Sequence, residues 1–142
     1  MIKHKTSIHL NCAPAQVFPF LSDPQKLLLW QSDLIKSEVE TAGPLRTGSR
    51  FREVRRMGRR ETEIRGEISD FEPDRCLATR TETKPHASVR YDLEPEEGGT
   101  RLRYVFTLQT AGLMRLMEPM IGTSIRKGTA ANLAKLRQLL EG

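Results

Sequence analysis

The stretch from 113 to 142, LMRLMEPMIGTSIRKGTAANLAKLRQLLEG, decides the fold of this chain. Its apolar residues recur mostly at intervals of three or four, the spacing of one face of an α-helix. These residues are Leu113, Leu116, Met117, Met120, Ile121, Ile125, Leu133, Leu136 and Leu140. Because Pro119 would cost a hydrogen bond inside a helix, we expect a separate turn over 113–118 and a long helix that starts at Pro119. The apolar face of this helix should be buried.

The residues before this helix are typical of short strands separated by turns. We predict strands at Lys3–Leu10, Leu34–Glu40, Ser49–Met57, Arg60–Phe71, Arg75–Thr83, Ala87–Glu94 and Thr100–Thr110. A short helix from Ala13 and a second helical turn over Gln25–Trp30 should follow the first strand. This order predicts an α+β fold in which an antiparallel sheet is covered by the long helix. A curved sheet wrapped around such a helix often leaves a cavity, which points to small-molecule binding.

Composition favours one domain spanning residues 1–142, which is close to the commonest domain size. No segment has the roughly 18 uninterrupted apolar residues of a membrane span, and the basic N-terminus is not followed by the apolar region of a secretory signal. Cys12 and Cys76 lie far apart and match no metal-binding spacing, so we interpret them as reduced, buried thiols. The sequence therefore predicts a cytoplasmic protein with no integral membrane segment.

Positive charge is concentrated in residues 50–65, which contain seven arginines and three glutamates. Such a cluster can attract nucleic acid or an anionic surface. It is also typical of a hairpin whose arginines and glutamates pair across strands on a solvated face. Since no aromatic residue lies between Arg52 and Arg65 to stack on bases, we do not expect nucleic-acid binding. A protein-interaction module that uses this basic hairpin to dock an acidic partner stays open as an alternative.

Several local strings resemble one known superfamily, in matching order and over essentially the whole chain. The strings are APAQVFPFLSDP (13–24), Trp30, GPLRTGSRFREV (43–54), DFEPDRCL (70–77), GGTRL (98–102) and LAKLRQLLE (133–141). The chain resembles the SRPBCC superfamily, with its START-like and birch pollen allergen-like members, and looks most like the polyketide cyclase/dehydrase-like branch. The resemblance implies a helix-grip fold, in which a curved antiparallel sheet of about seven strands surrounds a long C-terminal helix and two short helices follow the first strand.

For function, the resemblance implies that a hydrophobic or amphipathic molecule, such as a lipid, a quinone or a polyketide-like compound, binds between the sheet and the helix. A polyketide cyclase/dehydrase-type enzyme acting in that cavity is the alternative, and a fold alone does not choose between the two. The superfamily offers no invariant catalytic motif to carry over, so whether the chain is an enzyme stays open. The sequence also leaves a homodimer open.

Candidate polar residues come from the strand at 49–57. If Phe51 faces the cavity, as the resemblance suggests, then alternation places Glu53, Arg55 and Met57 on the same side. Glu53 could act as a base towards a carbon acid, with Arg55, Tyr91 or Tyr104 as donors to an enolate. In the opposite register, or with a bulge, both charges lie in water and Arg52 and Val54 turn inward. The sequence does not decide which face of this strand is inside.

The expected lining of the cavity is apolar and aromatic, with methionines that adapt to varied ligands. Its members are Trp30, Phe51, Met57, Ile64, Ile68, Tyr91, Tyr104, Phe106, Met117, Met120, Ile121 and Ile125. Met114 shares the helical spacing of the last two methionines, and all three could instead be ordinary core residues. His4, His9 and His86 show no metal-binding spacing, so we expect no metal and no cofactor.

Overall fold

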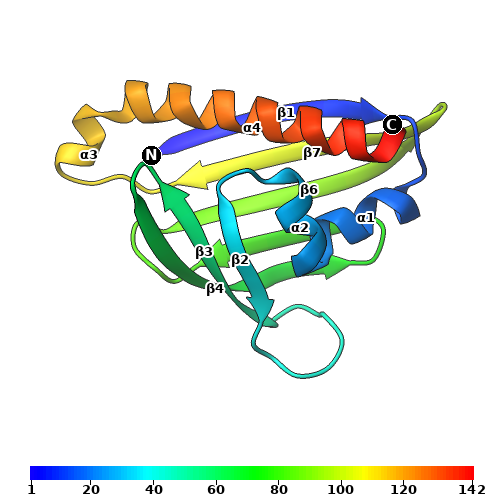
Figure 1. Cartoon of the computed structure of the whole chain (residues 1–142), viewed down its shortest axis with the longest axis horizontal. Helices are drawn as coiled ribbons and strands as arrows, with labels where there is room; N and C mark the ends of the chain where they lie inside the picture. Colours follow the sequence, from blue (N-terminus) through cyan, green and yellow to red (C-terminus); the bar gives the residue numbers. More distant parts are fainter.

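The computed structural model describes all residues, 1–142, and contains a single antiparallel sheet of seven strands. The strand order is β1-β7-β6-β5-β4-β3-β2, so β1 and β2 form the two edges. The sheet curves around the last helix (Figure 1). Its strands are β1 (Ile2–Leu10), β2 (Leu34–Val39), β3 (Arg50–Met57), β4 (Arg60–Glu72), β5 (Cys76–Thr81), β6 (Ala87–Glu96) and β7 (Gly99–Leu108).

Four helices accompany the sheet: α1 (Pro14–Ser22), α2 (Pro24–Trp30), α3 (Leu113–Leu116) and α4 (Glu118–Glu141). Pro14 opens α1, where the missing N–H of proline costs no hydrogen bond. Asp23 separates α1 from α2, because its side chain accepts a hydrogen bond of 2.9 Å from the backbone N–H of Gln25 and caps the second helix. These elements confirm the predicted α+β helix-grip fold and its element order.

The β6–β7 hairpin is tighter than predicted. We expected residues 95–99 to form the connection, but Pro95 pairs with Thr100 and Glu96 with Gly99, so both strands continue to the turn. Only Glu97 and Gly98 remain outside the strands, and Gly98 has a φ of 77°. A residue in this left-handed region allows a two-residue turn, which is why the longer connection is not needed.

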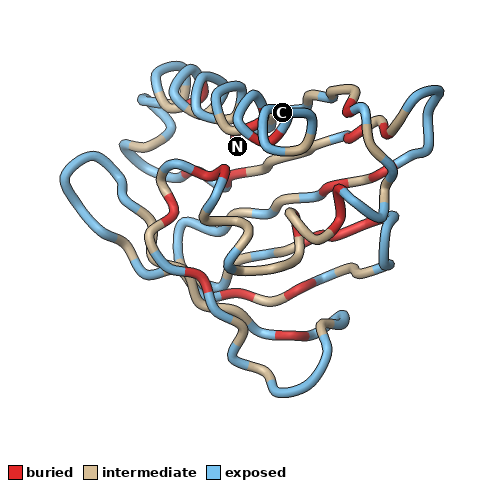
Figure 2. Tube along the Cα trace, turned by 45° about the vertical axis from the view of Figure 1, so that its right-hand side comes forward, coloured by how far each residue is buried: buried red, intermediate tan, exposed pale blue.

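The core lies between the sheet, α1, α2 and the C-terminal half of α4. Leu10, Leu102 and Leu136 are completely buried in a cluster of 12 residues that also includes Leu21 and Leu133. Buried segments are concentrated on the strands and along the inner side of α4 (Figure 2). Burying each large aliphatic side chain contributes roughly 1.5–3 kcal/mol, so this cluster anchors α4 on the sheet.

The first turns of the C-terminal region differ from the expectation of a continuously buried face. The structure confirms the break at 113–118 and a proline at the start of the long helix. However, Leu113, Leu116, Met117 and Met120 are exposed, at 79%, 80%, 48% and 64%. The helical spacing is present in this segment, but no other part of the chain covers it. In α4 the buried residues are Gly122, Leu133 and Leu136.

Candidate functional site

A cavity of about 750 Å³ lies between the sheet and α4. Of its 41 lining residues, 20 are hydrophobic, and the lining comes mainly from α1, α2, β2 to β7, α3 and α4. This volume falls within the range of roughly 300–1,000 Å³ that is typical of small-molecule sites. The curvature of the sheet around α4 therefore leaves room for a ligand of the size of a sterol, quinone or polyketide.

Most of the residues that we expected around the cavity do line it. They are Trp30, Phe51, Met57, Ile64, Ile68, Tyr91, Tyr104, Phe106, Ile121 and Ile125. Since Tyr104 and Phe106 both line it, the intervening Val105 is directed to the other face of β7. This arrangement describes the walls of the cavity, and contact between these walls and a ligand stays a prediction.

Two of the expected lining residues were wrongly placed. Met117 and Met120 are exposed and do not line the cavity, because the helix breaks between α3 and α4 and these side chains turn towards solvent. Met114, at the same spacing, does line it. Gly128 also lines it, and no atom lies within 4 Å of the position that a Cβ would occupy there. The small residue keeps space open on the cavity side of α4.

Strand β3 presents Phe51, Glu53, Arg55 and Met57 to the cavity, which is the first of the two registers considered for this strand. Arg52 lies on the outer face and pairs with carboxylates of the neighbouring strands β2 and β4. Opposite β3, Ile64 and Ile68 of β4 also line the cavity. A pair of opposite charges is therefore placed among apolar walls.

Arg55 is the centre of a hydrogen-bonded cluster in the cavity wall. Its Nε and Nη2 donate to Oε1 of Glu53 at 3.2 and 3.1 Å, and Nη2 also donates to Oε1 of Gln31 at 2.8 Å. Its Nη1 donates to Oδ2 of Asp33 at 3.1 Å. Burial opposes the charged guanidinium, but the nearby carboxylates of Glu53 and Asp33 raise the pKa of Arg55. Arg55 therefore stays charged in the cavity wall, between two carboxyl groups and one amide.

Two tyrosines lie close to this cluster. The rings of Tyr91 and Tyr104 are 5.4 Å apart, and the ring of Trp30 lies 6.3 Å from that of Tyr91. Burial raises the pKa of Tyr91 well above its ordinary value and also raises the pKa of Tyr104. Both phenols are thus protonated at neutral pH and can donate hydrogen bonds to a ligand.

Sequence reasoning missed several polar residues of the site. Gln31 and Asp33 follow α2 and contact Arg55, while Thr129 and Asn132 line the cavity from α4. The one signal for the first two is their position in the turn between α2 and β2, directly before a predicted strand. Thr129 and Asn132 carried no such signal, because polar residues on a long helix more often face solvent than a cavity.

The arginines of residues 50–65 are divided between paired and unpaired side chains. Arg50, Arg52, Arg55 and Arg65 form ion pairs with carboxylates. The arginines at and beside the β3–β4 turn, Arg56, Arg59 and Arg60, are exposed. Arg55 thus belongs to the cavity wall, the other three paired arginines lie on the outer face, and unpaired positive charge remains only at the tip of the hairpin.

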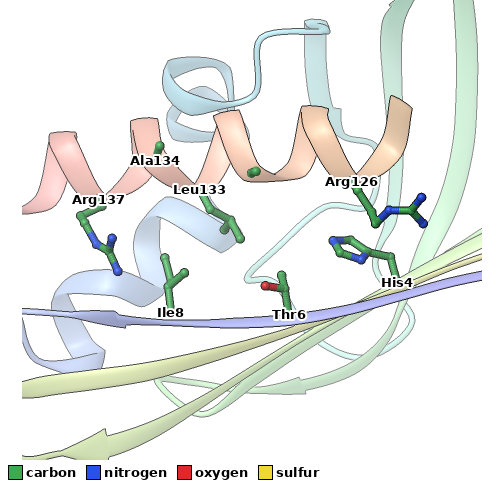
Figure 3. Close-up of a pocket in the computed structure, with 8 residues that line it drawn as sticks. His4, Thr6, Ile8, Arg126, Leu133, Ala134 and Arg137 are labelled. Atoms are coloured by element: carbon green, nitrogen blue, oxygen red, sulfur yellow. The ribbon is translucent and has the colours of Figure 1, made fainter. Parts of the chain in front are cut away.

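A second, smaller pocket of about 240 Å³ lies between β1 and α4. Figure 3 shows His4 and Arg126 at one end of it and Arg137 beside Ile8 at the other. The two arginines are eleven residues apart on one helix, about 16 Å along its axis, which is too far to hold one small anion. Arg137 also donates to the backbone oxygen of His9 at 2.9 Å. This pocket is therefore much smaller than the larger cavity, and its two arginines do not converge on one ligand group.

None of the helices is both long and apolar enough to cross a membrane. The curved seven-stranded sheet, the long C-terminal helix and the apolar cavity between them define a helix-grip protein. The chain belongs to the family of polyketide cyclases/dehydrases and lipid transport proteins, whose model matches residues 1–141. The resemblance to the SRPBCC superfamily is thereby confirmed. Family and fold indicate binding of hydrophobic ligands.

Several solved structures share this fold. The chain is similar to TTHA0849 from Thermus thermophilus, with a TM-score of 0.80, 13% identity, and 96% of this chain and 94% of that chain covered. It is also similar to a protein of unknown function, SA2116 from Staphylococcus aureus (TM-score 0.77, 15% identity, 99% and 93% covered). Ara h 8.0201 gives a TM-score of 0.73 at 14% identity, with 99% and 98% covered. A search of curated proteins finds no match. At these identities, the similarity shows the fold alone.

Proposed function

We propose that the protein binds an amphipathic, largely hydrophobic small molecule in the cavity between the sheet and α4. The observation that carries this proposal is a cavity of about 750 Å³ with apolar walls and one hydrogen-bonded polar cluster around Arg55. The apolar body of the ligand would lie against Ile64, Phe106 and Ile125, where burial of apolar surface supplies most of the affinity. The cluster around Arg55 would then fix its orientation.

The hydrogen bonding of the cluster suggests which polar group the ligand carries. Arg55 uses its donors on Gln31, Asp33 and Glu53, so little capacity remains for a ligand carboxylate. Both bonds to Glu53 end on Oε1, which leaves Oε2 to accept a hydrogen bond. A hydroxyl, phenol or amine on the ligand is therefore the best complement to this cluster. A free fatty acid would place a third carboxylate beside two others.

Ligand binding can be tested with the purified protein and an uncharged fluorescent probe, N-phenyl-1-naphthylamine. We expect saturable binding that is weakened at least tenfold by Ile121→Trp, because the larger side chain occupies the cavity. Met120→Trp is the matched control, since Met120 neighbours Ile121 on α4 but is exposed. Phe106→Trp and Val105→Trp form a second pair on β7. Equal affinity for all four variants would refute the assigned cavity. Native mass spectrometry of fresh protein would show whether a natural ligand is retained.

An enzymatic role is a second candidate, supported by the placement of Glu53, Tyr91 and Tyr104 in one cavity. A carboxylate that takes a proton from a carbon acid and protonated phenols that stabilise the enolate are the groups that a cyclase or dehydrase needs. Dehydration would leave two bound species that differ by the mass of one water. If Glu53→Gln retains probe binding but changes the ratio of the two species, then the protein is an enzyme. An unchanged ratio, or a single species, would favour a carrier.

We also propose the cytoplasm as the site of action, on the ground that both cysteines are free. Cys76 is buried and Cys12 is half-buried, and neither forms a disulfide. Disulfides are uncommon in the reducing cytoplasm, so two free thiols fit that compartment.

A further inference from the structure

Large apolar side chains gather on the surface at one end of the molecule. We call Met1, Leu113, Leu116, Met117 and Met120 the α3 patch. All five are exposed, and helix α3 has no buried residue at all. Soluble monomers rarely expose several large apolar side chains side by side, and contiguous patches of this kind mark interaction sites.

The α3 patch is held together by contacts of the N-terminus. The terminal ammonium group of Met1 donates to Oγ1 of Thr110 at 2.9 Å and lies 3.4 Å from the carboxylate of Glu118. Thr110 in turn donates to Glu118 at 3.0 Å. Residues from the two ends of the sequence therefore form one surface (Figure 1, where the N-terminus lies next to α3).

Unpaired positive charge lies at the same end. The β3–β4 turn and the β5–β6 connection reach this end of the molecule, as does α3 (Figure 1). They carry exposed cations that form no ion pair: Arg56, Arg59, Arg60, Lys84 and Arg115. Among the carboxylates of these segments, Glu118 pairs with the N-terminus and Glu82 with Arg50. Glu61 is the one exposed carboxylate of these segments that forms no ion pair.

The cavity opens between these groups. Its lining includes the exposed residues Met57, Gly58 and Lys84 on one side, and Met114 and Ile121 beside the α3 patch on the other. A hydrophobic ligand that leaves the cavity here would pass the apolar side chains of the α3 patch on one side and the exposed cations of the two β-turn segments on the other. This combination matches a bilayer, in which anionic headgroups surround an apolar interior.

We propose that this end of the molecule docks onto an anionic lipid bilayer, with the α3 patch inserted among the acyl chains and the surrounding cations on the headgroups. The docking goes beyond the proposed function, because it needs no ligand in the cavity. Its consequence is that ligand passes between cavity and bilayer without crossing water. A bilayer fits better than an acidic protein partner, because an apolar patch with cations at the same end of the molecule needs both an apolar and an anionic complement.

The test is flotation of the purified protein with vesicles of phosphatidylcholine, with and without phosphatidylserine. We expect binding to the anionic vesicles that weakens as salt is raised, since exposed charges are screened. Leu113→Glu/Leu116→Glu should lower the partition coefficient at least tenfold. Leu29→Glu is the control, because Leu29 is another exposed leucine, on α2 and outside the patch.

A second pair of variants tests the cations. Arg59→Glu/Arg60→Glu should lower binding to anionic vesicles about twentyfold or more, because each cation near a charged surface contributes about fivefold. Arg75→Glu is its control, since Arg75 is exposed in the β4–β5 turn at the opposite end of the sheet. Failure to float with anionic vesicles, or equal binding by variants and controls, would overturn the proposal.

Two further outcomes are informative. If the wild type sediments as a dimer and Leu113→Glu/Leu116→Glu as a monomer, then the patch binds a second copy and the membrane proposal is wrong. Probe binding in the absence of vesicles separates docking from ligand binding. A variant that keeps probe binding but loses flotation supports the proposal, whereas flotation without any probe binding by the wild type would count against the proposed function alone.

Discussion

The ion pair between Arg55 and Glu53 offers a quantitative test of how the cavity wall is built. The two side chains are 22% and 13% exposed, so solvent screens them only partly. Arg55→Met removes the bonds to Gln31 and Asp33 and leaves Glu53 without its partner. We expect a loss of about 3 kcal/mol in the free energy of unfolding, the low end for breaking a buried pair.

The double variant Arg55→Met/Glu53→Gln measures the coupling free energy between the two side chains. Glu53→Gln alone should cost about 1 kcal/mol, because the amide keeps one acceptor but loses the charge. Once Arg55 is absent, the same change removes an unpaired charge, so Arg55→Met/Glu53→Gln should lose only about 2 kcal/mol. The coupling between the two positions is therefore about 2 kcal/mol.

Urea unfolding followed by circular dichroism measures these free energies. The control is the pair Arg103 and Glu94, whose nitrogen and oxygen are 3.0 Å apart, close to the 3.1 Å of Arg55 and Glu53, but whose side chains are 58% and 62% exposed. Its cycle should show no measurable coupling. If the effects at Arg55 and Glu53 are additive within about 0.5 kcal/mol, then the pair is solvated and cannot orient a ligand.

Three further predictions concern packing and reactivity. Leu136→Ala, at a fully buried site, should cost roughly 2–5 kcal/mol in urea unfolding, whereas Leu139→Ala on the exposed side of α4 should cost much less. Gly99→Ala should lower the melting temperature clearly, because a Cβ there would lie 1.9 Å from a backbone oxygen of β1. Burial raises the pKa of Cys76 to about 11, so its alkylation by iodoacetamide at pH 8 should be slow. The rate of alkylation should rise about tenfold per pH unit until the thiol is ionised. A rate as fast as that of an exposed thiol would refute this burial.

The fold could be predicted from local patterns because they agree with one another. Alternation in residues 100–108 and the helical spacing from Leu133 to Leu140 each indicate one buried face, and the structure buries those faces. Proline residues then located the helix starts near Pro14 and Pro119 to within a residue. Errors at strand ends are small, because turn residues such as Gly98 decide the ends locally.

The site was harder to predict, because the lining of a cavity depends on how separate helices and strands are arranged in space. Met117 and Met120 share a spacing with Met114, but only Met114 lines the cavity, since the helix breaks between α3 and α4. Asp33 and Gln31 approach Arg55 only after β2 and β3 pair. Their sequence separation from Arg55 gives no periodic signal, so the charged cluster could be anticipated only in part.

The uneven packing of α4 has a consequence for how the molecule fluctuates. Leu133 and Leu136 fasten the C-terminal half of the helix to the core, whereas the first turns around Met120 rest on few buried side chains. Local opening needs less free energy where fewer apolar contacts are broken. Amide hydrogen exchange should therefore be fastest at the start of α4 and slowest near its end. The C-terminal half of α4 is thus anchored, and the largest fluctuations are expected in its first turns, beside the opening of the cavity.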